Sequence, residues 1–136
     1  MARPPPGSGA LGVSLCLAAL GLVVQLGTDR LTLAWTHSVE KIVWEEDWRD
    51  TPAGLVIDEA RVRGSGAGMD PPPEARFDGR DWRWKPVLPP LTGVDLRRSG
   101  ATADWRICIA GHCRPMGDYL PADADPVRLA SCQTVE

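Results

Sequence analysis

The sequence has only one Phe and one Tyr, and it contains no run of basic residues. A nucleic-acid-binding surface needs clustered Lys and Arg to displace counterions from phosphates, so the interspersed charges and the net charge of −3 argue against that class. The chain also lacks an internal repeat, and no long amphipathic helical pattern follows Gly27. These absences argue against a nucleic-acid-binding domain and a helical bundle.

Residues that favour turns are abundant, with 14 Gly and 13 Pro among 136 residues, and tryptophan occurs six times. The length suits one domain with a single modest core. From Arg30 onward, short β-type segments are separated by Pro and Gly, at 30–39, 41–50, 55–64, 82–88, 93–100, 102–109, 112–116 and 125–132. We therefore predict an all-β fold, a small antiparallel β-sandwich or barrel of seven to eight short strands.

One apolar helix is expected before this domain. The first residues, MARPPPGSGALGVSLCLAALGLVVQLG, hold Arg3 and then an uncharged apolar segment from Ala10 to Gly27, the pattern of an export signal. Its length is near the lower limit for a membrane span. Ala19-Leu20-Gly21 offers a cleavage site only inside the apolar run, so an anchor that stays attached is favoured over a cleaved signal. We expect residues 1–27 to be the signal peptide or anchor and residues 28–136 to be a domain in the periplasm, held at the inner membrane or secreted.

The cysteines agree with an oxidising compartment. In DWRICIAGHCRPM, a two-residue turn at Ala110-Gly111 places Cys108 opposite Cys113, where a cross-strand disulfide is plausible. A rival pairing joins Cys108 or Cys113 to Cys132. Three cysteines outside the expected helix leave one unpaired, so the connectivity stays open. A zinc site at His112 and Cys113 has too few ligands at a familiar spacing, and we predict no metal or cofactor.

The stretch WTHSVEKIVWEEDW concentrates polar and aromatic side chains, and it predicts two strands joined at Val39-Glu40-Lys41. His37 and Ser38 are adjacent, so in a strand they point to opposite faces and cannot form a nucleophile–base pair. No nucleophile-elbow pattern occurs in the chain. We therefore assign no catalytic residue and expect that the protein is not an enzyme.

Glu46 shares a strand face with Trp44 and Trp48, so burial is expected to raise its pKa unless a cation pairs with it. Arg61 or Arg63 of the next strand is the predicted partner. RGSGAGMDPPP, which follows, resembles a phosphate-binding loop but lacks the Gly-Lys-Ser/Thr signature, and its prolines forbid the helix that would hold a phosphate. Backbone amides of the loop Gly64 to Gly68, including Ser65 and Gly66, remain candidates for binding an anion.

Three segments carry a family resemblance: LTLAWTHSVEKIVWEEDW, ARVRGSGAGMDPPP and TADWRICIAGHCRPM. In this order they resemble a bacterial family known as domain of unknown function 1850. The resemblance covers nearly all of residues 30–132. It implies a short exported or membrane-anchored protein that accompanies TAXI-type TRAP (tripartite ATP-independent periplasmic) transporters, and hence an accessory role in uptake of an organic acid. It supplies no catalytic residues.

Two hypotheses follow. In the first, the domain is an interaction module that contacts the TRAP membrane subunit or its periplasmic binding protein, and Trp48, Arg49 and the 64–73 loop form the docking surface. In the second, it is a small ligand-binding or hydrolytic domain in which His37, Glu40 or Glu46 converges with Arg61 or Arg63 beside the glycine-rich loop. The first hypothesis is favoured by the resemblance.

Overall fold

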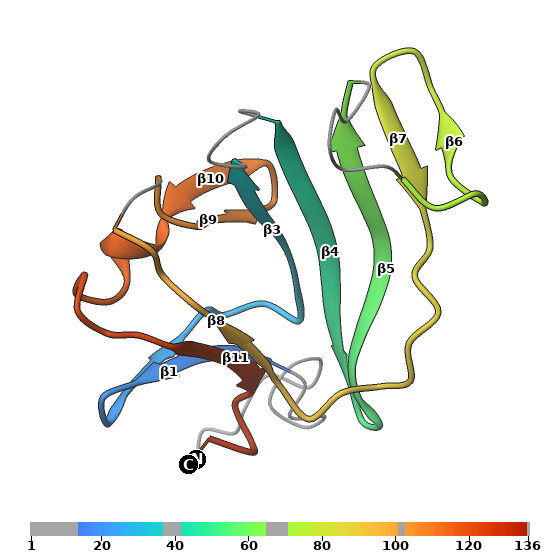
Figure 1. The fold of residues 1–136 in the computed structure, drawn as a ribbon. Helices are drawn as coiled ribbons and strands as arrows, with labels where there is room; N and C mark the ends of the chain where they lie inside the picture. Colours follow the sequence, from blue (N-terminus) through green and yellow to red (C-terminus); the bar gives the residue numbers. More distant parts are fainter. Residues whose placement is uncertain (1–13, 37–41, 65–70, 101–102, 136) are drawn as a thin grey trace.

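The computed structural model describes residues 14–36, 42–64, 71–100 and 103–135, and it shows an all-β domain (Figure 1). Eleven strands form two antiparallel sheets, and a short 3-10 turn, η1 (Met116–Asp118), follows β10. The predicted antiparallel β-sandwich is confirmed. There are more strands than the sequence patterns predicted, because two strands precede residue 30 and a third, short strand lies after residue 75.

The large sheet has seven strands in the order β10-β9-β3-β4-β5-β7-β6. Its members are β3 (Arg30–Thr36), β4 (Val43–Thr51), β5 (Gly54–Arg63), β6 (Arg76–Phe77), β7 (Asp81–Trp84), β9 (Arg106–Ile109) and β10 (His112–Pro115). Successive side chains of a strand point to opposite faces. Leu31 and Leu33 lie on the face that packs on the other sheet, which we call the inner face, and Thr32 lies on the opposite, outer face.

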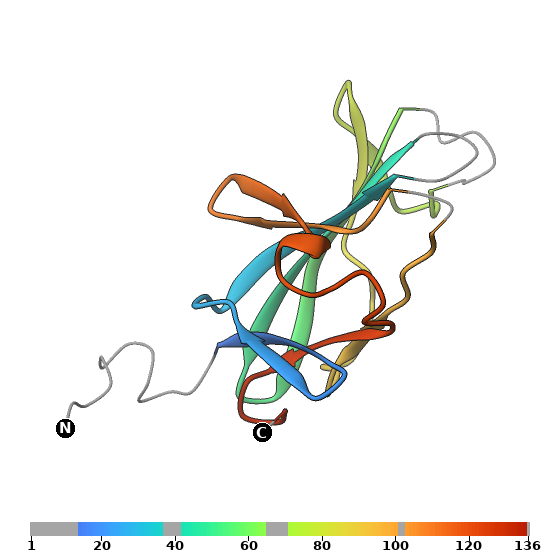
Figure 2. The same ribbon diagram turned by 90° about the vertical axis from the view of Figure 1, so that its left-hand side faces the viewer.

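The small sheet has four strands in the order β2-β1-β11-β8, with bounds Leu22–Gln25, Leu15–Ala19, Val127–Ser131 and Val94–Leu96. β1 therefore lies between β2 and the last strand of the chain. The strands of the small sheet cross those of the large sheet near the lower ends of β3 to β5, and β6 and β7 lie at the far end of the large sheet (Figures 1 and 2).

The predicted N-terminal helix is wrong for the part of it that the structure describes. Residues 15–25 form the β1–β2 hairpin, and its turn is made by Leu20 and Gly21, which have φ of 53° and 77°. Leu15, Cys16 and Leu17 are all fully buried. A short apolar run that is buried on both faces shows no alternation, so periodicity alone does not separate it from a helix.

The expected anchor from Ala10 to Gly27 is therefore not a helix from Ser14 onward, and residues 1–13 lie outside the described residues. Within the parts of the chain that the structure describes, no helix has the length and apolar character needed to cross a bilayer.

The core lies between the two sheets. It is built from β1 and β11 on one side and from β3, β4, β5 and β9 on the other, with Met116 and Leu120 closing one end. Its fully buried large side chains are Leu15, Leu17, Leu33, Leu55, Val62, Ile107, Met116, Leu120, Val127 and Leu129. Since residues from both chain ends contribute, the core forms only when β1 and β11 meet.

A tryptophan cluster continues the inner face of the large sheet beyond this core. Trp35 stacks on Trp44 with ring centroids 5.8 Å apart, and Trp105 lies 4.9 Å from Trp35. Trp84 meets Trp44 edge-on at 5.9 Å. Such pairs contribute about 0.5–1.5 kcal/mol each beyond burial of their area. The tryptophans thus stabilise the end of β3 and β4 that the small sheet does not reach.

Two disulfides join the four cysteines: Cys16–Cys132 and Cys108–Cys113. The cross-strand pair predicted for the β9–β10 hairpin is confirmed. The expectation of an unpaired cysteine is wrong, because Cys16 belongs to the domain and pairs with Cys132. Disulfides of this kind are typical of an extracellular or periplasmic environment.

Replacing Leu17 tests whether β1 is part of the folded domain. Leu17→Ala is expected to lower the free energy of unfolding by about 2–5 kcal/mol, because it leaves a cavity in the core. Val23→Ala, on the exposed side of the same hairpin, should cost less than about 1 kcal/mol. Urea denaturation of the full chain measures both values. Equal stability of Leu17→Ala and the wild type would contradict the placement of β1.

Candidate functional site

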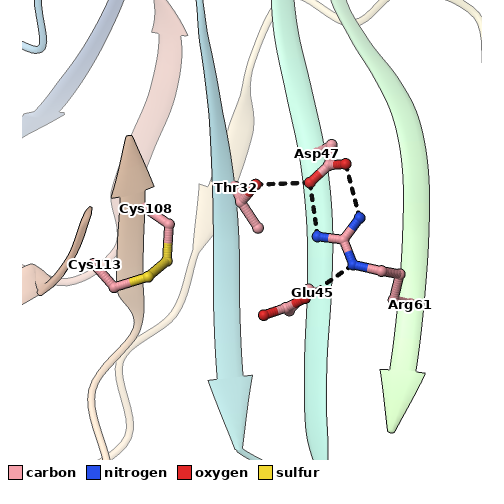
Figure 3. Close-up of a disulfide and its surroundings, with 6 residues drawn as sticks. All are labelled: Thr32, Glu45, Asp47, Arg61, Cys108 and Cys113. Carbon is pink, nitrogen blue, oxygen red and sulfur yellow. Dashed lines mark hydrogen bonds and ion pairs between the residues drawn. A yellow bond between two sulfur atoms is a disulfide. The ribbon is translucent and has the colours of Figure 1, made fainter. Parts of the chain in front are cut away.

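A groove runs along the outer face of the large sheet, between the disulfide of the β9–β10 hairpin and a cluster of charged side chains on β4 and β5. Its volume is about 450 Å³, and Thr32 of β3 lies between its two sides (Figure 3). The disulfide side consists of Cys108, Cys113 and the turn Ala110-Gly111, and the charged side includes Glu45, Asp47 and Arg61. The groove therefore brings together residues from five neighbouring strands.

Arg61 is the centre of the charged side. Its guanidinium donates to Glu45 Oε1 at 2.9 Å, to both oxygens of Asp47 at 2.8 and 2.9 Å, and to Glu59 Oε1 at 2.7 Å. The Arg61 side chain is only 13% exposed, so three carboxylates surround a cation that is mostly shielded from water. Hydrogen bonds, first of all with Asp47, raise the pKa of Arg61 above its ordinary value. The two-pronged contact between Arg61 and the carboxylate of Asp47 is among the stronger kinds of side-chain interaction.

A β-bulge explains why so many charges meet here. Trp48 of β4 lies opposite Ile57, but the preceding residue, Asp47, lies opposite Glu59, so Asp58 is an extra residue in β5. A bulge shifts the alternation of the strand by one residue. Leu55 and Ile57 face the core before it, and Ala60 and Val62 face the core after it. Arg61 and Arg63 are thereby turned to the outer face.

The cluster extends on both sides of Arg61. Thr32 Oγ1 donates to Asp47 at 2.7 Å, and Arg83 of β7 donates to Glu59 at 2.7 Å. Burial alone would raise the pKa of Asp47, but hydrogen bonds from Arg61 and Thr32 together lower it below the ordinary value. A chain of hydrogen bonds thus crosses β3, β4, β5 and β7. The charges of this face chiefly satisfy one another, which fixes the alignment of the strands.

A disulfide forms the other side of the groove. Cys108 and Cys113 are directly opposite each other in the β9–β10 ladder, and Ala110 and Gly111 make the turn with φ of 53° and 84°. Cys108 is half-buried, and Cys113 is exposed. On its other side, Cys108 is aligned with Thr32 of β3. The disulfide therefore lies on the outer face, in line with the Arg61 cluster (Figure 3).

The two disulfides differ in what they contribute to the fold. Cys16–Cys132 spans 116 residues and Cys108–Cys113 spans 5. In the chain-entropy model, a disulfide stabilises by restricting the unfolded chain, by about 5 kcal/mol for the long loop and about 2 kcal/mol for the short one. Cys16–Cys132 is the main covalent constraint on the domain, whereas Cys108–Cys113 acts on a single hairpin.

The structure does not bring together the residues that the ligand-binding hypothesis required. Glu46 lies on the inner face, where Trp48 Nε1 donates to its Oε1 at 3.0 Å. Arg61 is on the outer face, and Arg63 donates weakly to Asp81 at 3.4 Å. The predicted ion pair between Glu46 and Arg61 or Arg63 is therefore wrong, because the bulge reverses the direction of both arginines. Burial raises the pKa of Glu46, although the hydrogen bond from Trp48 opposes the shift.

Of the remaining predicted site residues, only some belong to the part of the chain that the structure describes. His37, Glu40, Ser65 and Gly66 lie outside the described residues. Gly64 directly follows β5 with φ of 75°, and its N–H donates to the carbonyl of Arg80 at 3.0 Å.

Of the predicted docking residues, Trp48 is 4% exposed and belongs to the core, so its proposed role in docking is wrong. Arg49 is on the outer face and forms a two-pronged pair with Asp58. Among the described residues, no group of three or more His, Cys, Asp or Glu side chains is arranged to hold a metal.

Sequence reasoning missed Thr32, Asp47 and Glu59, which complete the outer face. Glu45 and Asp47 alternate in the sequence, and this spacing does place both on one face. The missing information was the identity of the cation opposite them. Which cation lies opposite these carboxylates depends on the bulge at Asp58, and no sequence pattern indicates that bulge.

The fold and the site define a small disulfide-containing β-sandwich protein with a charged groove that one of the disulfides borders. Residues 31–116, more than half of the chain, match the model of a family described as a domain of unknown function (DUF1850), and the chain belongs to this family. The resemblance seen in the sequence is thus confirmed. No curated protein and no solved structure gives a significant match.

Removing the central cation tests the outer face. Arg61→Met is expected to lower the free energy of unfolding at pH 7 by roughly 2–3 kcal/mol, because it leaves three carboxylates facing one another. Arg49→Met, which breaks one half-exposed pair, should cost less than about 1 kcal/mol. The lowered pKa of Asp47 stabilises the fold above its ordinary value of 3.8, and this contribution is lost as pH falls. The difference in urea midpoint between Arg61→Met and the wild type should therefore become smaller from pH 7 through pH 5 to pH 3. A difference that stays constant over these pH values would contradict this role.

Glu46→Gln tests the inner-face carboxyl. Because its pKa is raised in the folded state, ionisation of Glu46 costs stability as pH rises above 4.5. The amide oxygen of Gln still accepts the hydrogen bond from Trp48, so the variant should be more stable than the wild type at pH 7 and similar to it at pH 4. Glu45→Gln, on the outer face, should instead be less stable at pH 7 because its bond to Arg61 is weakened. A loss of stability in Glu46→Gln would indicate a cationic partner for Glu46.

Proposed function

We propose that this protein is a non-catalytic interaction module that acts outside the cytoplasmic membrane and docks onto its partner through strand β2 of the small sheet. β2 is at the edge of that sheet, and the described residues provide no strand on its free side. Leu20, Leu22 and Val23 of this hairpin are 64%, 47% and 46% exposed. The exposed apolar edge of β2 is the observation that carries the proposal.

The other sheet edges are protected in ways that β2 is not. Native proteins blunt edge strands with charge, proline or short length, because an open edge offers unpaired backbone groups to another chain. β10 carries Arg114 and Pro115, and β6 is only two residues long. β8, at the opposite edge of the small sheet, has three residues, one of them Asp95. β2 has four residues, LVVQ, without charge or proline.

An added strand is the binding mode that this edge favours. An extended segment of the partner pairs with the backbone of β2, and its alternate side chains pack on Leu22 or Val23. Main-chain hydrogen bonds supply affinity, and the apolar contact supplies selectivity. This mode needs no pocket and no catalytic group on the chain.

The partner we propose is a component of a TAXI-type TRAP transporter, either its membrane subunit or its periplasmic binding protein. Membership of the family supports this choice through the resemblance described above. The disulfides agree with a location where such components are exposed. The module would then assist uptake of an organic acid by holding transporter components together.

Crosslinking in cells of the native host tests the proposal. The full chain is crosslinked, purified by affinity and analysed by mass spectrometry, and we expect recovery of a TRAP subunit with crosslinks near β2. Val23→Lys should reduce this recovery about tenfold or more, since a lysine at the edge opposes strand addition. Val87→Lys is the matched control, because Val87 is 94% exposed and belongs to no strand of either sheet.

Both variants must have urea midpoints close to the wild-type value. A loss of recovery then reflects lost binding and not lost folding. Recovery of this chain alone, in cells shown to express the transporter, would overturn the proposed partner. Equal recovery with Val23→Lys and with the wild type would overturn the proposed docking edge.

A further inference from the structure

The disulfide Cys108–Cys113 has the features of a reactive bond, and we propose that it is a thiol–disulfide exchange site that accepts electrons from the dithiol of a partner protein. This inference goes beyond docking at β2, which lies on the other sheet. The bond borders the groove of about 450 Å³ on the outer face, and the turn beside it consists of the small residues Ala110 and Gly111. A second chain can therefore approach Cys113 without displacing a large side chain.

Exposure separates this bond from the other disulfide of the same chain. Cys16 is fully buried in β1, and its partner Cys132, the residue after β11, is half-buried. Cys113 is exposed, and Cys108 is half-buried. Exchange needs direct attack of a thiolate on a sulfur, so access decides which disulfide reacts. The chain thus carries one bond with an exposed cysteine and, as an internal reference, one bond between a buried and a half-buried cysteine.

The fold does not depend on Cys108–Cys113 remaining closed. β9 pairs with β3 through Ile107, which is opposite Leu33 and fully buried. After β10, Met116 is fully buried as well, and its N–H donates to the carbonyl of Trp105 at 2.7 Å. Both ends of the hairpin are therefore held by non-covalent contacts. β10 is an exposed edge strand, so it can adjust when the bond opens.

The reaction balances as a two-electron exchange. One thiolate of the partner dithiol attacks Cys113 Sγ, a mixed disulfide forms, and the Cys108–Cys113 bond breaks. Cys108 leaves as a thiolate and takes up a proton. The second partner thiolate then attacks the partner's sulfur in the mixed disulfide, forms the partner's disulfide and releases Cys113, which is protonated in turn. The chain gains two electrons and two protons, and the partner dithiol is oxidised.

The test uses the full folded chain, dithiothreitol as a small dithiol and reduced thioredoxin as a protein dithiol. Free thiols are blocked with a maleimide at timed intervals and located by peptide mass spectrometry. We expect both reagents to expose Cys108 and Cys113 at least tenfold faster than Cys16 and Cys132. A thioredoxin variant without its second active-site cysteine should be trapped on Cys113.

One double variant serves as the control for the fold and for the label. The double variant Cys108→Ser, Cys113→Ser should keep the wild-type circular dichroism spectrum and a cooperative urea transition, and should take up no label under the same conditions. If both disulfides open together, or if Cys108–Cys113 stays closed until the protein unfolds, the proposal is overturned. Opening by dithiothreitol but not by thioredoxin overturns the claim of a protein partner. None of these results depends on the transporter, so they are independent of the proposed function.

Discussion

The pairing of the first described strand with the last one is the constraint on which the rest of the structure depends. β1 lies against β11 along four residue pairs, and Cys16–Cys132 locks the two strands together. β2 and β8 belong to the small sheet only through β1 and β11, respectively. Without this pairing the inner face of the large sheet, with Leu33, would face water. Burial of that face is the main favourable term in folding, so closure of the two chain ends and formation of the core are one event.

The same constraint explains what the sequence could and could not predict. Alternating segments such as 30–36 were predictable as strands because one of their faces is buried and the other is not. The segment 15–19 was not, because both of its faces are buried, and its apolar run imitates an export helix. The cross-strand disulfide of β9 and β10 was predictable from a two-residue turn, which fixes register locally. The pairing of Cys16 depends on strands 116 residues apart, and no local pattern encodes it.

The charged face shows a second limit of sequence reasoning. Strict alternation from Leu55 would place Arg61 on the core side, within reach of Glu46. The extra residue at Asp58 reverses this phase, so Arg61 meets Asp47 and Glu59 instead. A bulge is set by the fit of β5 to β4 as a whole, so it becomes visible only in three dimensions. Glu46 is left half-buried on the inner face, and burial raises its pKa, although the hydrogen bond from Trp48 opposes the shift.

The distribution of charge and apolar surface bears on where a partner can bind. On the outer face, Arg61 is already surrounded by carboxylates, so a charged ligand there would have to replace bonds that exist. At β2, the backbone groups of the free edge are unused by the described strands, and the side chains beside them are apolar. Binding at the edge exchanges hydrogen bonds to water for hydrogen bonds to the partner and breaks none within the protein, which favours it over binding at the outer face. The segment that matches the family model, 31–116, includes neither β2 nor the strands β1 and β11 that position it. Docking through backbone hydrogen bonds tolerates many side chains, so a recognition surface of this kind leaves little trace in a sequence motif.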